Sequence, residues 1–157
     1  MVETARRELQ EQLRRGAPRD AVAALHSRFI DHAVVGLFHL VRFWAGIHSV
    51  VAPLTAIAVG SYGESLVLPT TSPELLLLVP EGGRERPQAE LMATYLVDTL
   101  GGIGLAPTHS TKTAWECLAV AGNEPSELAR LASSRHLAGA FGAWVRLREA
   151  IDEMRWD

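Results

Sequence analysis

Hydrophobic positions divide the chain into segments of different period. Residues 3–15 form a short, highly charged stretch, and Gly16 and Pro18 separate it from the long segment 18–48. In that segment apolar side chains recur at steps of three and four residues, the period of one helical face. The predicted buried face consists of Val22, Leu25, Phe29, Ala33, Gly36, Leu40 and Trp44, widened by Val34, Val35, Leu37, Phe38 and Val41. The pattern therefore predicts two helices within residues 1–50.

The middle of the chain, residues 51–112, has the pattern of a β-α-β core. Segments 54–60 and 74–79 are short and apolar, as expected of buried strands. The tight turn 60–63 connects the first strand to a short helix. The remaining elements are an amphipathic helix at 87–100, with Leu91, Tyr95, Leu96 and Leu100 toward the core, and a third strand at 103–108.

Residues 113–157 are predicted to be helical throughout. A first helix covers 113–120, and Ser126 is a good N-cap for a second helix at 127–137. A last helix covers 140–156. The whole order, helices before and after a β-α-β unit, predicts one α/β (α+β) domain over residues 1–157 with a small mixed sheet.

Composition narrows the class of protein. The chain has 157 residues, of which 48% are hydrophobic and 21% charged, and this excludes disordered and low-complexity proteins. A net charge of −3 creates no field that would attract nucleic acid. Cys117 is the one cysteine, which excludes a disulfide framework and a cysteine-built zinc site, and it is interpreted as a small buried hydrophobe.

Two features indicate a cytoplasmic protein. Acids stand in the first turn and no apolar stretch follows directly, so no signal peptide is predicted. The apolar segment 33–60 is interrupted by polar side chains and proline, so we expect a buried helix and strand there rather than a membrane span. These interruptions are His39, Arg42, His48 and Pro53. The histidines at positions 26, 32, 39, 48 and 109 are interpreted as structural, because their spacing matches no metal site or catalytic triad.

Four motifs share the order and spacing of a known family. They are Ser27-Arg28-Phe29-Ile30-Asp31; Ala58-Val59-Gly60-Ser61-Tyr62-Gly63 with Pro69 and Ser72-Pro73-Glu74-Leu75; Thr108-His109-Ser110-Thr111-Lys112-Thr113 with Glu116-Cys117-Leu118; and Leu131-Ala132-Ser133-Ser134-Arg135 up to Gly139. Together they resemble the nucleotidyltransferase core of the bacterial PII uridylyltransferase family. The resemblance spans about residues 16–140 and implies the DNA-polymerase-β-like nucleotidyltransferase fold, with a small mixed sheet.

The resemblance also implies site positions. In that family a glycine-rich turn approaches the triphosphate, and strand carboxylates hold two metal ions for transfer of a nucleoside monophosphate. The nucleotide-binding positions correspond here to Gly60, Ser61, Tyr62, Gly63 and Lys112. The three metal-binding carboxylates correspond to Ser72, Glu74 and Ala106. The Arg and Gly that follow the Tyr-Gly pair in the family pattern correspond to Glu64 and Ser65. Glu74 is thus the one carboxylate left at these positions, either a weak metal ligand or a solvated acid at the start of the strand, and the predicted site is degenerate.

Three functions follow as hypotheses. The first is a catalytically inactive nucleotidyltransferase-like domain with a regulatory or scaffolding role in nitrogen regulation, with a PII-type signalling protein as partner and no cofactor. The second is a divergent active enzyme that uses Mg²⁺ and an NTP to label a protein acceptor, with Glu74 and a displaced acid, Glu64 or Asp98. The third is a homodimeric interaction module built on the second helix, without nucleotide binding.

Other partners and activities are not expected. Neither nucleic acid nor a membrane is predicted as a partner. The resemblance implies that full family enzymes carry an HD hydrolase domain and ACT sensor domains after this core. Because the given sequence reaches Asp157, we expect neither deuridylylation nor glutamine sensing from it.

Overall fold

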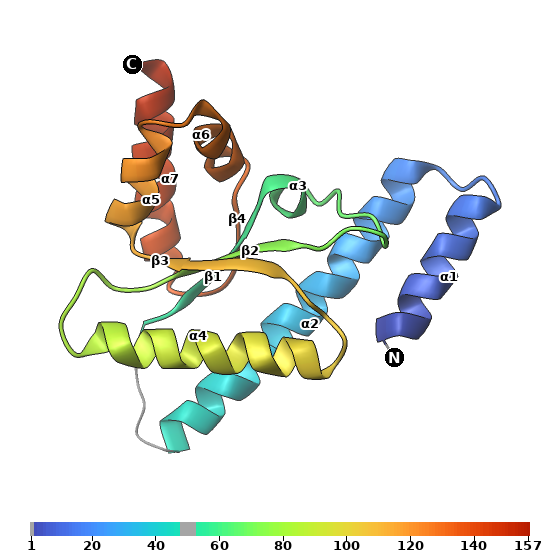
Figure 1. Cartoon of the computed structure of the whole chain (residues 1–157), viewed down its shortest axis with the longest axis horizontal. Helices are drawn as coiled ribbons and strands as arrows, with labels where there is room; N and C mark the ends of the chain where they lie inside the picture. The colour runs from blue at the N-terminus through green and yellow to red at the C-terminus, as the bar shows by residue number, and fades with distance from the viewer. Residues whose placement is uncertain (1, 48–52) are drawn as a thin grey trace.

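The computed structural model describes residues 2–47 and 53–157. Within these ranges it has seven helices and a four-stranded mixed sheet (Figure 1). The elements are α1 (Val2–Arg14), α2 (Arg19–Ile47), β1 (Thr55–Val59), α3 (Gly60–Gly63), β2 (Glu74–Leu78), α4 (Glu85–Gly102), β3 (Thr108–Lys112), α5 (Ala114–Ala121), α6 (Pro125–Ala132), β4 (Arg135–Gly139) and α7 (Phe141–Trp156). The predicted α/β class with a mixed sheet is confirmed.

The sheet order is β3-β2-β1-β4. Strand β1 is antiparallel to β2 and to β4, whereas β2 and β3 are parallel. In this register Val59 is opposite Glu74, and Glu74 is opposite Thr108. The end of β1 therefore meets the beginnings of β2 and β3 at one end of the sheet, and α3 follows directly there.

Helices cover both faces of the sheet (Figure 1). Because side chains alternate along a strand, Leu75 and Leu77 face the core formed with α2 and α4. Leu76 and Leu78 face the core formed with α5, α6 and α7. The run of four leucines is thus buried on both faces, as its sequence predicts.

Most predicted elements agree with the structure within about two residues at each end, but β3 does not. It spans Thr108–Lys112 rather than 103–108. Gly104 has a φ of 92° and Pro107 has no N–H to donate, so the apolar stretch ahead of the strand turns instead of extending. Strand β3 is a polar edge strand, and its exposed side chains gave no hydrophobic signal.

The C-terminal third is not wholly helical, contrary to the prediction. Helix α6 ends at Ala132, and Arg135–Gly139 forms β4 where a helix was expected to run to residue 137. The helix also starts earlier, with Glu124 as N-cap and Pro125 in its first turn, rather than with Ser126 as cap. Pairing with β1 outweighs the local helix preference of Arg, Leu and Ala in this segment.

The buried face of α2 also differs from the predicted one. Ile30, Val34 and Phe38 are buried, whereas Leu25, Leu40 and Trp44 are exposed. The last half of the helix is apolar on nearly every side, so periodicity alone could not select the face that packs. On α4, Leu91 is likewise exposed, and Ala89, Met92 and Ala93 take its place in the core together with Leu96 and Leu100.

Helix α2 is also the one described helix that is long and apolar enough to cross a membrane by length and composition. A core helix of a globular domain meets the same criterion. In the structure α2 packs against α4 and against β4. The adjacent His48 of the sequence prediction lies outside the described residues.

Candidate functional site

The four residues of α3, Gly60–Gly63, make a tight turn at the end of β1, where the sequence predicts nucleotide contacts. We call this segment the turn. Gly60 has a φ of 61°, a left-handed conformation that glycine adopts without steric cost. Ser61 is exposed. The side chain of Tyr62 is fully buried, and burial together with the nearby Asp31 carboxylate raises its pKa. Tyr62 could therefore contact a ligand only through its backbone.

Both glycines of this turn make room for groups of the protein itself. A Cβ atom at Gly60 would overlap the Oε2 atom of Glu74. A Cβ atom at Gly63 would overlap the carbonyl oxygen of Ser133, just after α6. The close approach that these glycines permit is thus taken up by a carboxylate on one side of the turn and by backbone on the other.

The three positions corresponding to metal ligands lie at the same end of the sheet. Glu74 is the first residue of β2, and Ser72 and Ala106 are exposed residues in the loops that lead into β2 and β3. The Thr108 N–H donates to the Pro73 carbonyl at 2.9 Å, which fixes the two loops side by side. The positions come together, but an alcohol and a methyl group replace two charged oxygen ligands.

The carboxylate of Glu74 already faces a cation of the protein. Its Oε1 atom lies 4.0 Å from Nη1 of Arg130 on α6. Arg130 in turn donates two hydrogen bonds to Glu127, of 3.0 Å from Nε and 2.9 Å from Nη2. These hydrogen bonds hold the pKa of Glu127 below its usual value and raise the pKa of Arg130. The donor set at this end of the sheet therefore does not fit the Mg²⁺ that the resemblance implies.

A second arginine holds the other side of the turn. Arg135 on β4 donates to both carboxylate oxygens of Asp31 on α2, at 2.8 and 3.1 Å. It also donates to the Tyr62 carbonyl at 3.0 Å, and its guanidinium carbon lies 5.3 Å from the centre of the Tyr62 ring. Arg135 thus fixes the turn against α2.

Sequence reasoning did not predict the roles of these four charged residues. Asp31 and Arg135 stand inside two of the motifs that carry the family resemblance, which was a usable signal. Glu127 and Arg130 carry only the weaker signal of opposite charges three residues apart on a helix.

Lys112 is not brought to the turn by its backbone. It is the last residue of β3, opposite Leu78, whereas Glu74 pairs with Thr108 at the first residue of that strand. Four residues of strand correspond to about 13 Å. The charge of Lys112 acts on Glu116 and Cys117, and also on Glu127, the partner of Arg130.

The displaced acids of the active-enzyme hypothesis do not join Glu74. Glu64 is exposed and lines a hollow of about 320 Å³ together with Ser133 and Arg155. Asp98 is exposed on α4, which covers the opposite face of the sheet from Arg130. Among residues 2–47 and 53–157, no group of three or more His, Cys, Asp or Glu side chains is arranged to hold a metal ion.

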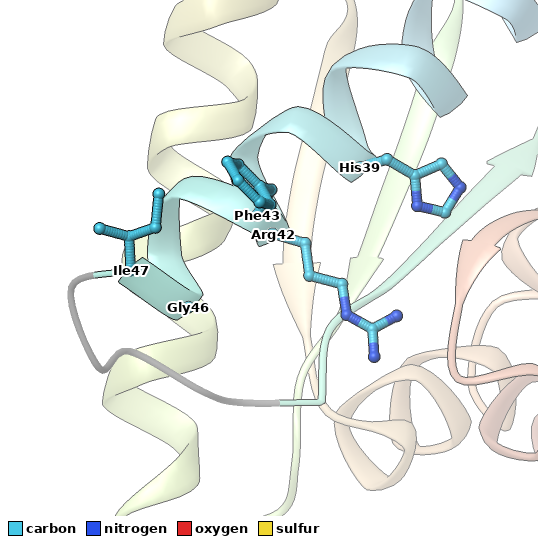
Figure 2. A pocket seen from close by; sticks show the side chains of 5 residues that line it. All are labelled: His39, Arg42, Phe43, Gly46 and Ile47. Atoms are coloured by element: carbon cyan, nitrogen blue, oxygen red, sulfur yellow. The ribbon is translucent and has the colours of Figure 1, made fainter.

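Larger hollows lie away from the turn. One, of about 600 Å³, lies on α2, where Figure 2 shows His39 and Arg42 beside Phe43, Gly46 and Ile47. Another, of about 480 Å³, lies at the opposite end of the sheet, between Thr55, Leu78 and the first turns of α5 and α7. Neither contains a residue that the sequence predicts for nucleotide or metal binding.

Comparison with known proteins gives distant relatives. No family model matches the chain. The chain is 29% identical over 150 residues to the bifunctional uridylyltransferase/uridylyl-removing enzyme of Methylococcus capsulatus, which covers 95% of this chain and 16% of that enzyme. The enzyme of the same name from Bordetella avium is 32% identical over 124 residues, 79% of this chain and 13% of the enzyme.

A third relative has the same extent. The bifunctional uridylyltransferase/uridylyl-removing enzyme of Bordetella pertussis is 30% identical over 150 residues, 96% of this chain and 16% of that enzyme. The chain therefore spans about one sixth of the length of the relatives that it matches most fully. It is distantly related to a segment of the bifunctional uridylyltransferase/uridylyl-removing enzymes.

Proposed function

We propose that this chain is a degenerate nucleotidyltransferase-like domain that has lost metal-dependent catalysis and has a regulatory or scaffolding role. The observation that carries the proposal is the surrounding of Glu74. It is the one carboxylate at the three positions corresponding to metal ligands, and it faces Arg130 at 4.0 Å. A cation of the protein thus faces the one carboxylate that remains to hold a metal ion.

The chemistry explains why this change removes activity. Transfer of a nucleoside monophosphate through two metal ions requires carboxylates that hold both ions near the α-phosphate. Each 1.36 kcal/mol of lost transition-state stabilisation slows a reaction about tenfold. Losing the carboxylates at positions 72 and 106, at several kcal/mol each, leaves no useful rate.

The partner that we propose is a protein of the PII type in the cytoplasm. The support is the similarity to uridylyltransferase segments, together with the motif order along the chain. A surviving nucleotide contact would involve the backbone of Gly60, Ser61 and Gly63, without Mg²⁺. Such a contact would make the domain a nucleotide sensor, and its absence would leave a scaffold.

A labelling assay tests the loss of catalysis. The purified protein is incubated with a PII protein, each radiolabelled NTP, and Mg²⁺ or Mn²⁺. We expect no labelling of the acceptor. Labelling that Glu74→Ala abolishes would contradict the proposal and support the active enzyme.

A thermal titration tests nucleotide binding separately. The melting temperature is followed with each NTP, with and without Mg²⁺. A ligand at about 100 times its Kd raises the midpoint by roughly 5–10 °C in a domain of this size. A rise without Mg²⁺ would indicate a sensor, and a rise that needs Mg²⁺ would again favour the enzyme.

A second candidate function, a protein-interaction module, is favoured by the surface of α2. Leu40, Phe43 and Ile47 are 57%, 69% and 64% exposed and lie on neighbouring turns. Exposed apolar side chains gathered in this way are typical of interaction surfaces. Sedimentation velocity over a range of concentrations tests for a homodimer, with Phe43→Glu as the variant that should keep the chain monomeric.

A further inference from the structure

Arg130 has an unusual position between α6 and the start of β2. Its side chain is 24% exposed, and those of Glu74 and Glu127 are 33% and 16% exposed. Its Cγ atom lies 3.6 Å from the point where a Cβ atom on Gly60 would stand. The guanidinium thus lies beside the turn, with one carboxylate on α6 and another on β2.

We infer that Arg130 is a resident counter-cation, which balances the charge of Glu74 and Glu127 and makes this end of the sheet indifferent to divalent metal ions. The inference rests on the proposed function, because it gives the reason why a site with one remaining family carboxylate no longer takes Mg²⁺. Its consequence is that substitution of Arg130 should create affinity for a divalent ion.

Electrostatics supports this role for an arginine. A guanidinium keeps its charge at every physiological pH and offers a planar set of N–H donors to carboxylates. Arg130 directs two donors to Glu127 and leaves Nη1 toward Glu74. Because it is part of the chain, a dissolved ion must displace it from both carboxylates before it can bind.

Substitution should expose the latent cation site. Arg130→Glu removes the guanidinium and adds a third carboxylate next to Glu74 and Glu127. Mn²⁺ and Mg²⁺ bind carboxylate oxygens, so three charged groups gathered at one rim should attract either ion. The same substitution should destabilise the protein without metal, since like charges then repel each other.

The experiment compares four versions of the chain of residues 1–157: wild type, R130E, R130E/E74Q and R42E. Binding is measured from the loss of the free Mn²⁺ signal in electron paramagnetic resonance. Thermal midpoints are followed with Mn²⁺ or Mg²⁺ against sodium chloride of equal ionic strength. R42E is the matched control, because Arg42 is exposed on α2 and positions 38, 39, 45 and 46 carry no carboxylate.

We expect wild type and R42E to bind no Mn²⁺ at about 5 mM and R130E to bind one ion. An ion at about ten times its Kd should raise the R130E midpoint by roughly 3–6 °C. Addition of E74Q should weaken that binding at least about tenfold, the effect of losing a charged ligand. If R130E does not fold, R130Q carries the test, with weaker Mn²⁺ binding expected than for R130E but more than for wild type.

Two results would overturn the inference. One is Mn²⁺ binding by the wild type that R130E or R130Q does not strengthen. The other is a folded R130 variant that binds no more Mn²⁺ than R42E does. Neither result concerns NMP transfer, which the labelling assay measures on the wild type, so failure of this inference and failure of the proposed function are distinguishable.

Discussion

Two arginines lie beside the same turn on different sides, and their surroundings differ. Arg135 joins three parts of the fold, since it binds Asp31 on α2 and the Tyr62 carbonyl from its place on β4. Arg130 binds Glu127 within its own helix and reaches Glu74 only at 4.0 Å. Removing Arg135 should therefore damage the fold, whereas removing Arg130 should change mainly the charge at the end of the sheet.

The difference separates the side of the turn that is packed into the fold from the side that faces Glu74, the one carboxylate at the positions corresponding to metal ligands. On the Ser133 and Arg135 side the turn is packed against backbone and a part-buried ion pair. On the Glu74 side, the atoms nearest to the position of a Cβ on Gly60 belong to the side chains of Glu74 and Arg130. Packing against Ser133 and Arg135 is thus sufficient to explain the shape of the turn.

The two glycines of the turn give the largest expected effect. Gly63→Ala would drive a Cβ atom into the Ser133 carbonyl, and backbone must then move, so we expect a loss of about 3 kcal/mol in the free energy of unfolding. Gly60→Ala meets only the flexible Glu74 side chain and the strain of a positive φ, about 1–2 kcal/mol. Urea unfolding of both variants measures the difference, and equal losses would contradict the division of the turn into two sides.

Substitution of the two arginines should give the next largest loss in the free energy of unfolding. Arg135→Ala leaves Asp31 without its bidentate partner and frees the Tyr62 carbonyl, so we expect a loss of about 2–3 kcal/mol. Arg130→Ala removes an ion pair that lies within one helix, three residues apart, and joins no distant parts of the fold, so it should cost less than about 1 kcal/mol. The same urea experiment checks both values. A larger loss of stability in Arg130→Ala than in Arg135→Ala would mean that Arg130, and not Arg135, has the structural role.

The sequence predicted the parts of this arrangement that depend on local patterns. Strands β1 and β2 are short apolar runs, and Gly60–Gly63 is a turn by composition. Strand β4 was not predicted, because Arg135 to Gly139 lack the residue pattern typical of a strand. They become a strand only by pairing with β1.

The site shows the same limit. The family resemblance predicts that Glu74 is the one carboxylate at the three positions corresponding to metal ligands, and this stays a prediction. The pairing of Asp31 with Arg135 spans 104 positions, and the approach of Arg130 to Glu74 depends on how α6 docks beside β2. The family motifs mark Asp31 and Arg135 as residues of interest, but nothing in the sequence pairs them or brings Arg130 to Glu74.

The Arg130–Glu127 pair should also make the unfolding free energy depend on pH in the acid range, with a smaller effect than the substitutions above. Hydrogen bonds from Arg130 hold the pKa of Glu127 below its ordinary value of 4.5 in the folded protein. The pair therefore stabilises the fold fully above that value, and its contribution is lost as pH falls through the lower, folded pKa. Glu127→Gln should remove this pH dependence and cost about 0.5–1 kcal/mol at neutral pH.

Unfolding free energies of wild type and Glu127→Gln, measured from pH 7 down to the acid transition, test this. The two curves should converge as pH falls below about 4.5. Glu124→Gln is the matched control, because Glu124 is exposed at the start of the same helix. Convergence of the Glu124→Gln curve instead would place the titrating carboxylate outside the Arg130 pair.

The smallest expected change concerns Cys117, which lies on the Arg130 side of the sheet, in the core formed with α5, α6 and α7. Burial raises the pKa of its thiol to about 11, so at pH 8 only about one thiol in a thousand is ionised. Reaction with a disulfide reagent should be about 100-fold slower than for an exposed thiol. Because Arg130 contributes charge rather than packing, Arg130→Ala should leave that rate within about threefold of wild type, whereas Arg135→Ala should raise it by increasing the unfolded population. A thiol that becomes fully reactive in Arg130→Ala would mean that the ion pair, and not the apolar core, keeps α6 in place.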